Sequence, residues 1–511
     1  MSPRNRRAWF AVAASIAAVV CTSPIQAAFL TLATARLVTN TTGGLNQNAS
    51  IDKSGKLILF TSNVDHVHTS GTIFSESATF DFDSSGNGFT PAGATHPNPA
   101  CTNCSTSNAT AGNLYLWRAS KKGSSPANSV KQLTFSATGG FTANQAADLN
   151  QKGTFVAWDS DRDHTGGNGD GNREIFLMEI ATGTPTQITS TTGNGDTANR
   201  SASLSSDAKT LGFDSRGDFA GPSCTLTDLV SPCDNADGNS EIMVYKRDTG
   251  KFIQVTKTTG GTSQANVRAR VSDDGRFVAF QSTRSFAGSL AGGIVCTQLD
   301  GVSACDNADA NGEIMLVDLK DNLMTQVTNT APGGGCTGTT ANERAEVSTR
   351  GGYVSFQSTC EAQLNPSGCG ACNNNDEVFL ANIKKKTIQQ LTISDAGYNR
   401  VPRVSGNGTY VVFESNRSYK TQNPSHGRTI YLLRRSNGRA PTGQTAPGQV
   451  IEDGSSALLQ NAKAQISSTA FSGGFNSAIE QFGVSFNGRF VAFDNQKNVG
   501  NQEIFFVDGK K

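Results

Sequence analysis

One repeated segment constrains this chain more than any other feature. Its clearest copy is Arg268–Phe280, RARVSDDGRFVAF, which predicts a strand, a tight turn at Asp273-Asp274-Gly275 and a second, apolar strand. Asp supplies local side-chain hydrogen bonds in such a turn, and Gly supplies a positive φ. The segment occurs seven times, and its copies end at Phe60, Trp158, Phe213, Phe280, Phe356, Phe413 and Phe493. A repeat of this kind determines the architecture of the whole chain.

Two more strands follow each copy except the last, which is followed by one. The third strand is apolar and usually begins with Glu, as in Glu241–Val244, and the fourth carries a Gln-apolar-Thr signature, as in Gln254-Val255-Thr256. Four antiparallel strands in each unit, repeated with no helical period between them, are the pattern of a β-propeller. We therefore predict an all-β fold, a seven-bladed β-propeller of four-stranded antiparallel blades.

The unit resembles the propeller repeat of the TolB family. In that family an SPDG turn is followed by an apolar-Ala-Phe strand, an Ile-Tyr-type strand and a closing Leu-Thr. The closest matches are Ser272–Gly275 with Phe280, and Asn407-Gly408 with Phe413, and the resemblance covers most of the chain from about Ala35 onward. TolB carries an α/β domain before its propeller, and related proteases add a hydrolase domain. We find no G-x-S-x-G elbow and expect neither domain here.

The two ends of the chain predict how the ring closes. The last repeat stops at its third strand, Glu503–Val507, while Arg36–Thr39 looks like a fourth strand without a repeat of its own. We expect this N-terminal strand to complete the last blade, which would leave few free strand edges. Residues 28–511 then form a single propeller domain with a long loop insertion at 62–113 and an insert at 437–461.

The first 27 residues have the layout of a secretory signal peptide. Arg4, Arg6 and Arg7 precede the apolar run Phe10–Val20, and small residues at Ala27 and Ala28 offer a cleavage site. The apolar run is too short to span a bilayer comfortably. We predict a periplasmic or secreted protein without a membrane-spanning segment. The formal net charge of +1 argues against nucleic acid as a partner.

Ten cysteines follow the signal peptide, and an even number in an exported chain favours disulfides. Cys224 with Cys233, and Cys296 with Cys305, occupy the same place in adjacent repeats, so each pair most simply closes its own loop. Cys101 with Cys104, and Cys369 with Cys372, could do the same, which leaves Cys336 and Cys360. The two CxxC pairs lack a nearby histidine and a βαβ pattern, so zinc and thioredoxin chemistry are not expected.

Acidic loops precede the third strand in three blades and suggest calcium. Calcium takes six to eight oxygen ligands from carboxylates, amides and carbonyls. The loops offer Asp170, Asn172 and Glu174, then Asp234, Asp237, Asn239 and Glu241, then Asp306, Asp309, Asn311 and Glu313. The same residue types are also ordinary turn residues, and the spacing is not that of an EF-hand. Calcium is the one cofactor that the sequence suggests.

Four arginines form a second candidate site. Arg200, Arg268, Arg344 and Arg400 lie at the start of the first strand in four successive blades. First strands line the central channel of a propeller, so these arginines could ring its mouth and bind a carboxylate, a phosphate or an acidic peptide end. The alternative is that each pairs with a neighbouring acid, such as Glu343, and ties the blades together.

The long loops fall mostly on one face, where binding usually occurs. We expect an exported, non-catalytic scaffold that binds a protein, a peptide or another ligand at this loop-rich face. The alternative is a propeller enzyme, of the polysaccharide lyase or hydrolase type, acting at the central channel. Only five histidines are present and they are expected at the surface, and no nucleophile–base arrangement can be assembled from the sequence.

Overall fold

The computed structural model describes most of the repeat region of the 511-residue chain. The described residues are 36–38, 44–63, 112–119, 128–136, 143–193, 199–219, 223–260, 265–286, 294–333, 336, 341–365, 374–394, 396–417, 429–434, 450–451, 462–465, 483–498 and 501–508. The predicted signal peptide and most of the inserts at 62–113 and 437–461 lie outside them.

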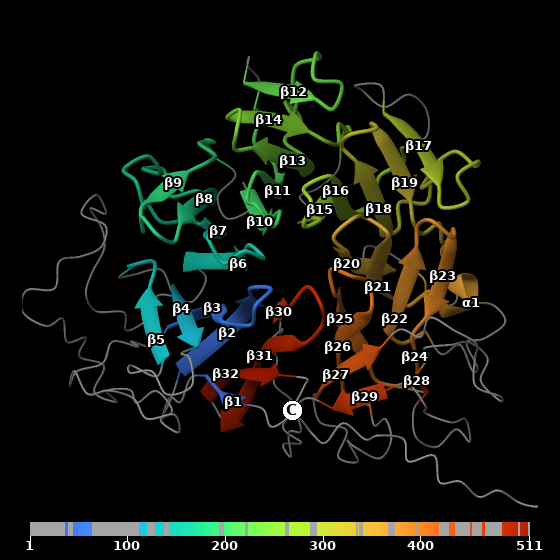
Figure 1. Cartoon of the computed structure of the whole chain (residues 1–511). Coiled ribbons are helices and arrows are strands. Elements are labelled where there is room, and N and C mark those ends of the chain that lie inside the picture. Colours follow the sequence, from blue (N-terminus) through green and yellow to red (C-terminus); the bar gives the residue numbers. More distant parts are fainter. Residues whose placement is uncertain are drawn as a thin grey trace, which may run out of the picture.

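Sheets of antiparallel strands are arranged around a common centre, with the first strand of each repeat nearest to it (Figure 1). Three sheets have four strands: β6 (Asn144–Leu149), β7 (Phe155–Ser160), β8 (Glu174–Glu179) and β9 (Pro185–Gln187); β20 (Asn342–Val347), β21 (Tyr353–Ser358), β22 (Glu377–Asn382) and β23 (Thr387–Gln390); and β25 (Asn399–Val404), β26 (Tyr410–Ser415), β27 (Thr429–Arg434) and β29 (Ala462–Gln465). The predicted strand–turn–strand repeat is therefore confirmed.

Two further sheets add a fifth strand at their outer edge. They are β10 (Asn199–Leu204), β11 (Thr210–Ser215), β13 (Glu241–Lys246), β14 (Lys251–Gln254) and β12 (Cys224–Leu226); and β15 (Asn266–Val271), β16 (Phe277–Ser282), β18 (Glu313–Asp318), β19 (Leu323–Gln326) and β17 (Val295–Gln298). The outer strands β12 and β17 come from the cysteine loops and pair in parallel with β14 and β19.

The largest sheet joins the two ends of the chain. Its eight strands are β30 (Gly483–Val484), β31 (Phe490–Asn498), β32 (Asn501–Asp508), β2 (Gly44–Ile51), β3 (Leu57–Ser62), β4 (Asn113–Ala119), β5 (Asn128–Gln132) and β1 (Arg36–Leu37), which pairs antiparallel with β32. A two-stranded sheet of β24 (Thr392–Ile393) and β28 (Val450–Ile451) and the short helix α1 (Glu361–Leu364) complete the described elements.

The structure confirms the all-β propeller but not the predicted count of seven separate blades. The described strands form six sheets of four or more strands. The count differs because β2 and β32 hydrogen-bond in parallel, at Gly44↔Asn501 and Leu45↔Gln502, and so merge the strands of the first and last repeats into one sheet.

The aromatic residue that ends each sequence repeat lies in the core. All seven are at most 1% exposed: Phe60, Trp158, Phe213, Phe280, Phe356, Phe413 and Phe493. Several stack on the aromatic residue opposite them on the third strand, as Phe60 does on Tyr115 and Phe356 on Phe379, with ring centroids 5.8 and 5.6 Å apart. Such a pair adds about 0.5–1.5 kcal/mol to the burial of the rings.

The inner strands carry a feature that the sequence analysis did not predict. One residue of each inner strand, the fifth of β2 and the third of β6, β10, β15, β20 and β25, has a positive φ of 43° to 63° and coincides with a β-bulge. These residues are Asn48, Ala146, Ser201, Arg268, Arg344 and Val401. In this conformation the backbone N–H can bond to the preceding sheet. Arg268 N donates to Asp214 Oδ1 at 3.0 Å, and Val401 N to Gln357 Oε1 at 2.8 Å. The bulges therefore tie adjacent sheets together at the centre.

Candidate functional site

Six side chains, each two residues after the positive-φ residue of its inner strand, form what we call the channel ring: Ser50, Asp148, Ser203, Arg270, Glu346 and Arg403. Members from different sheets contact one another. Ser50 Oγ donates to Asp148 Oδ1 at 3.3 Å, and Arg270 Nε lies 3.6 Å from Glu346 Oε2. Arg403 Nη1 donates to the same Glu346 oxygen. The ring therefore connects blades that are distant in the sequence.

One carboxylate of the channel ring is shared by two guanidinium groups. The side chains of Arg270, Arg403 and Glu346 are 15%, 16% and 19% exposed. Burial lowers the pKa of Arg270 to about 10, and the Arg403 charge lowers it further while Glu346 opposes this. Arg270 is thus still protonated at neutral pH, and a single carboxylate serves two guanidinium groups.

A cavity that we call the arginine pocket lies on the side of the ring nearer the start of the inner strands. It is lined by four arginines and one acid, Arg268, Arg270, Arg344, Arg403 and Glu346, together with Ala146, Ser201, Ala345, Val401 and Pro402. Its volume is ≈ 90 Å³. Whole small-molecule ligands occupy sites of about 300–1,000 Å³, so this pocket suits a single charged group. Guanidinium forks bind carboxylates and phosphates with paired hydrogen bonds.

The four predicted arginines divide into two groups. Arg268 and Arg344 line the arginine pocket, whereas Arg200 and Arg400 do not. Three of the four also pair with acids, as the alternative anticipated. Arg200 Nε lies 3.7 Å from Asp214 Oδ2, Arg268 Nη1 lies 2.6 Å from Glu343 Oε2, and Arg400 Nε lies 2.6 Å from Asp376 Oδ2. Their role in ligand binding stays a prediction.

An acidic pocket lies on the other side of the channel ring, toward the turns between the first and second strands. It consists of two overlapping cavities of ≈ 80 and ≈ 70 Å³, both lined by Asp148, Asp273, Glu346 and Arg403. Burial raises the pKa of Asp273 to about 6, although Thr349 Oγ1 donates to its Oδ2 at 2.7 Å. Burial also raises the pKa of Asp148. Arg270, Glu346 and Arg403 line both pockets, while Arg268 and Arg344 line only the arginine pocket and Asp148 and Asp273 only the acidic pocket.

The sequence analysis missed Asp148, Arg270, Glu346 and Arg403. The signal was present, because all four occupy the fifth position of the first strand in their repeats. In β15 the residues on either side of that position, Ala269 and Val271, are buried. Side chains alternate along a strand, so a charged residue between two buried ones must face the channel.

The glutamates of the acidic loops are engaged within their own blades. Glu241 Oε1 accepts hydrogen bonds from Thr258 N at 2.6 Å and Thr258 Oγ1 at 2.7 Å, and its Oε2 accepts from Asn266 Nδ2 at 3.0 Å. Glu174 and Glu313 bond in the same way to Thr191 and Thr330. Burial raises the pKa of Glu241 and of Glu313 to about 7. Each glutamate thus fixes the segment that follows the Gln-apolar-Thr strand.

The aspartates of these loops lie at the surface. Asp170, Asp237 and Asp309 are exposed, while Asn172, Asn239 and Asn311 are buried beside them. Asp234 Oδ2 pairs with Lys257 Nζ at 2.9 Å, and Asp306 N donates to Gln326 Oε1 at 2.7 Å. Among the described residues, no three His, Cys, Asp or Glu side chains are grouped to hold a metal ion. Calcium binding stays a prediction.

Three predicted disulfides join cysteines in the described part of the chain: Cys224–Cys233, Cys296–Cys305 and Cys336–Cys360. Cys101, Cys104, Cys369 and Cys372 lie outside the described residues. The first two disulfides close loops whose tips are apolar and exposed, with Val230 83% and Val302 85% exposed.

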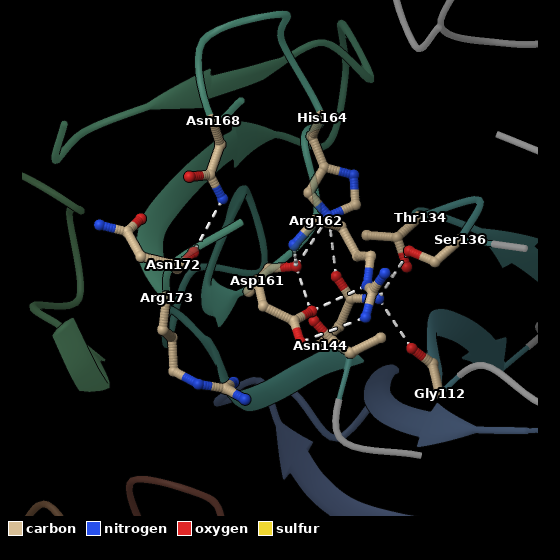
Figure 2. Close-up of polar contacts among 12 residues, drawn as sticks. Gly112, Thr134, Ser136, Asn144, Asp161, Arg162, His164, Asn168, Asn172 and Arg173 are labelled. Carbon is tan, nitrogen blue, oxygen red and sulfur yellow. Dashed lines mark hydrogen bonds and ion pairs between the residues drawn. The ribbon is translucent and has the colours of Figure 1, made fainter. Parts of the chain in front are cut away.

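His164 was expected at the surface, but it is buried, with 3% of its area exposed. Its ring packs edge-on against Phe176, with centroids 5.0 Å apart, and its Nε2 lies 2.8 Å from Asn144 Oδ1 (Figure 2). Burial lowers the pKa of His164 to about 4, so the ring is neutral at physiological pH. The expectation failed because the acidic-loop segment folds this residue back over the core aromatics Trp158 and Phe176.

No protein-family model matches the chain, and no curated protein matches its sequence. Similar solved structures include TolB from Acinetobacter baumannii, at 18% identity and a TM-score of 0.35, where the match covers 66% of this chain and 59% of that one. A putative TolB from Agrobacterium tumefaciens is 13% identical with a TM-score of 0.35, covering 74% and 94%. An oligogalacturonate lyase from Vibrio parahaemolyticus is 11% identical with a TM-score of 0.44, covering 94% and 92%.

The chain has a β-propeller fold, and TolB structures are among the solved structures to which it is similar. The similarities concern fold alone, and no activity is carried over from them. No helix in the described ranges is long and apolar enough to cross a membrane.

Proposed function

We propose that this protein is an exported, non-catalytic propeller that binds an acidic group of a protein or peptide partner in the arginine pocket. The observation that carries this proposal is the lining of that pocket, where four arginines face one glutamate. An additional carboxylate would offset part of the remaining positive charge, and arginine is the side chain best suited to hold it in a fixed orientation.

The size and place of the pocket indicate how much of the partner enters it. A cavity of ≈ 90 Å³ accepts an acidic side chain or a chain end. The rest of the partner would then lie on the loop-rich face, to which the start of the inner strands leads. Loops on a rigid scaffold are the usual place for such contacts.

Two features of the whole chain belong to the same proposal. We infer seven blades, with β30, β31, β32 and β1 as the last blade and β2 to β5 as the first; the antiparallel pairing of Arg36 with Phe506 supports this assignment. We also infer export with removal of residues 1–27, in a periplasmic or secreted setting, because the three disulfides suit an oxidising compartment.

The test is binding of a short fluorescent peptide with two C-terminal glutamates, compared with its amidated Gln-Gln counterpart. The double variant R268A/R344A should bind the acidic peptide about 30-fold or more weakly, since each charge-assisted hydrogen bond contributes about 1.5–3 kcal/mol. The control is Arg276→Ala, which removes an arginine that pairs with Asp318 and Asp321 and lines neither pocket.

Three outcomes would count against the proposal. The first is equal binding of the acidic and amidated peptides, and the second is an equal loss of affinity in the control variant. The third is turnover of an acidic oligosaccharide that depends on Arg268 and Arg344, which would support the enzyme alternative.

A further inference from the structure

Three loops on the loop-rich face share the sequence N-x-D-x-N and a common hydrogen-bond pattern. We call Asn168–Asn172, Asn235–Asn239 and Asn307–Asn311 the asparagine loops. In each, the first Asn Nδ2 donates to the main-chain oxygen of the second, at 2.9, 3.0 and 3.0 Å. The second Asn Nδ2 donates to the main-chain oxygen of a threonine, at 2.6, 2.7 and 2.6 Å.

These contacts fix which end of each amide is oxygen, because every named partner is an acceptor and only Nδ2 can donate to it. The position of each Oδ1 atom follows from that assignment. Figure 2 shows Asn168 and Asn172 at their hydrogen bond, with both side-chain oxygens on the same side of it.

All six of these side-chain oxygens are buried and have no hydrogen-bond partner. Their residues are between 1% and 6% exposed: Asn168, Asn172, Asn235, Asn239, Asn307 and Asn311. Asn375 Oδ1, at the corresponding place in the next blade, is in the same state. Buried polar atoms are normally satisfied, so an arrangement repeated in successive blades calls for a ligand.

The ligand chemistry of the loops suits a cation. The six amide oxygens are acceptors that no donor satisfies. Calcium approaches its oxygen ligands to about 2.3–2.6 Å and accepts amide carbonyls among them. The middle aspartate of each loop lies next to these amides. Asp237 Oδ2 accepts hydrogen bonds from Asn239 Nδ2 at 3.3 Å and from Gly260 N at 2.7 Å, so its other oxygen, Oδ1, would be the ligand.

We propose that each asparagine loop binds one hard divalent cation, calcium in an exported setting, through its two Asn side-chain oxygens and its middle aspartate. The glutamates expected from the sequence are not ligands, because threonines and an asparagine already occupy their carboxylates. The site is separate from the arginine pocket and does not depend on the proposed function.

Cation binding would brace the loop-rich face. Asn235 Nδ2 also donates to Gly217 O at 3.3 Å, beyond the end of β11, while Asn239 Nδ2 donates to Gly260 O at 3.2 Å, in the link to the next blade. One ion per loop would therefore hold three segments together around the face.

The test is calorimetric titration of the chelator-treated full-length mature protein with calcium, together with its melting temperature in calcium and in chelator. We expect three equivalents of calcium and a calcium-dependent rise in melting temperature. Asp237→Asn should reduce the stoichiometry to two. The triple variant D170N/D237N/D309N should bind calcium at least tenfold more weakly and show no calcium-dependent rise in melting temperature. Each substituted side chain still has an oxygen that can accept hydrogen bonds from the loop amides.

The control is Asp321→Asn, which makes the same charge change at an exposed turn outside the loops. The variant Asn235→Ala tests one amide oxygen directly. If this variant does not fold, the aspartate variants show whether the loops bind calcium. No calcium-dependent shift at millimolar calcium would overturn the proposal. An equal effect of sodium chloride at the same ionic strength, or an equal loss in the control, would also overturn it, because both indicate general charge screening.

Discussion

Replacing Glu346 by Gln tests the central electrostatic argument about the channel. Glu346 Oε2 lies 3.6 Å from Arg270 Nε and accepts a hydrogen bond from Arg403 Nη1. The substitution keeps the size of the side chain and removes its charge. Two guanidinium groups, only 15% and 16% exposed, would then face each other without their shared carboxylate.

Two opposite effects should follow. Breaking a fully buried ion pair costs about 3–5 kcal/mol; because these groups keep some solvent contact and Asp148 remains near, we expect a loss of about 2 kcal/mol in the free energy of unfolding. The arginine pocket, in contrast, loses its one acid. At an effective dielectric constant of about 20 and a separation of about 6 Å, a unit charge contributes about 2.8 kcal/mol. With screening, affinity for an acidic peptide should rise about 10- to 100-fold.

Urea unfolding and peptide binding on the same protein measure both effects. The control is Asp318→Asn, which removes a carboxylate bound to Arg276 at 2.5 Å away from the channel, and should leave peptide affinity unchanged. An unchanged or weaker affinity in the Glu346→Gln protein would refute the assignment of the arginine pocket as an anion site.

Three other expectations concern stability. Replacing Cys296 and Cys305 by Ser opens a disulfide between residues nine apart and should lower the free energy of unfolding by about 2–3 kcal/mol. An equal free energy of unfolding for the variant and the unchanged protein, measured without reductant, would contradict this. Folding lowers the pKa of His164 from 6.5 to about 4. The neutral ring therefore contributes fully to the free energy of unfolding above pH 6.5, and about 3 kcal/mol of that free energy is lost as the pH falls toward 4. His164→Asn should therefore flatten the pH dependence of stability in that range, and an unchanged slope would argue against burial of the neutral ring. Ala310 and Gly238 lie at equivalent loop positions with φ of 57° and 65°, a conformation that favours Gly. In chemical unfolding, Ala310→Gly should therefore raise the free energy of unfolding by about 0.5 kcal/mol and Gly238→Ala should lower it by about 1 kcal/mol. Changes of the reverse sign would contradict the argument that this backbone conformation strains Ala.

The parts of the fold that could be predicted from the sequence are those with local signals. The turn at Ser272–Gly275 forms as expected, since Gly275 has a φ of 71° and Asp274 Oδ1 accepts a hydrogen bond from Arg276 N at 3.1 Å. The Cys224–Cys233 loop is equally local. The apolar strand before Phe280 and the third strand that pairs with it follow from composition and spacing.

The channel site depends on contacts between residues of different blades, so no local signal could assemble it. Arg270, Glu346 and Arg403 meet only when three inner strands converge, and the bulge at Arg268 that shifts their register is recognised only from the strand pairing. The partners of the acidic-loop glutamates were hidden for a related reason. Thr258, which donates to the Glu241 carboxylate, lies 17 residues further along the chain.

The segregation of charge along the channel gives the molecule a direction. Arg268 and Arg344 lie toward one end and Asp148 and Asp273 toward the other, so a field runs along the channel axis. A chain entering from the loop-rich face would be attracted with its negative end leading and repelled in the opposite orientation. The propeller would thus select the polarity of what it binds as well as its charge.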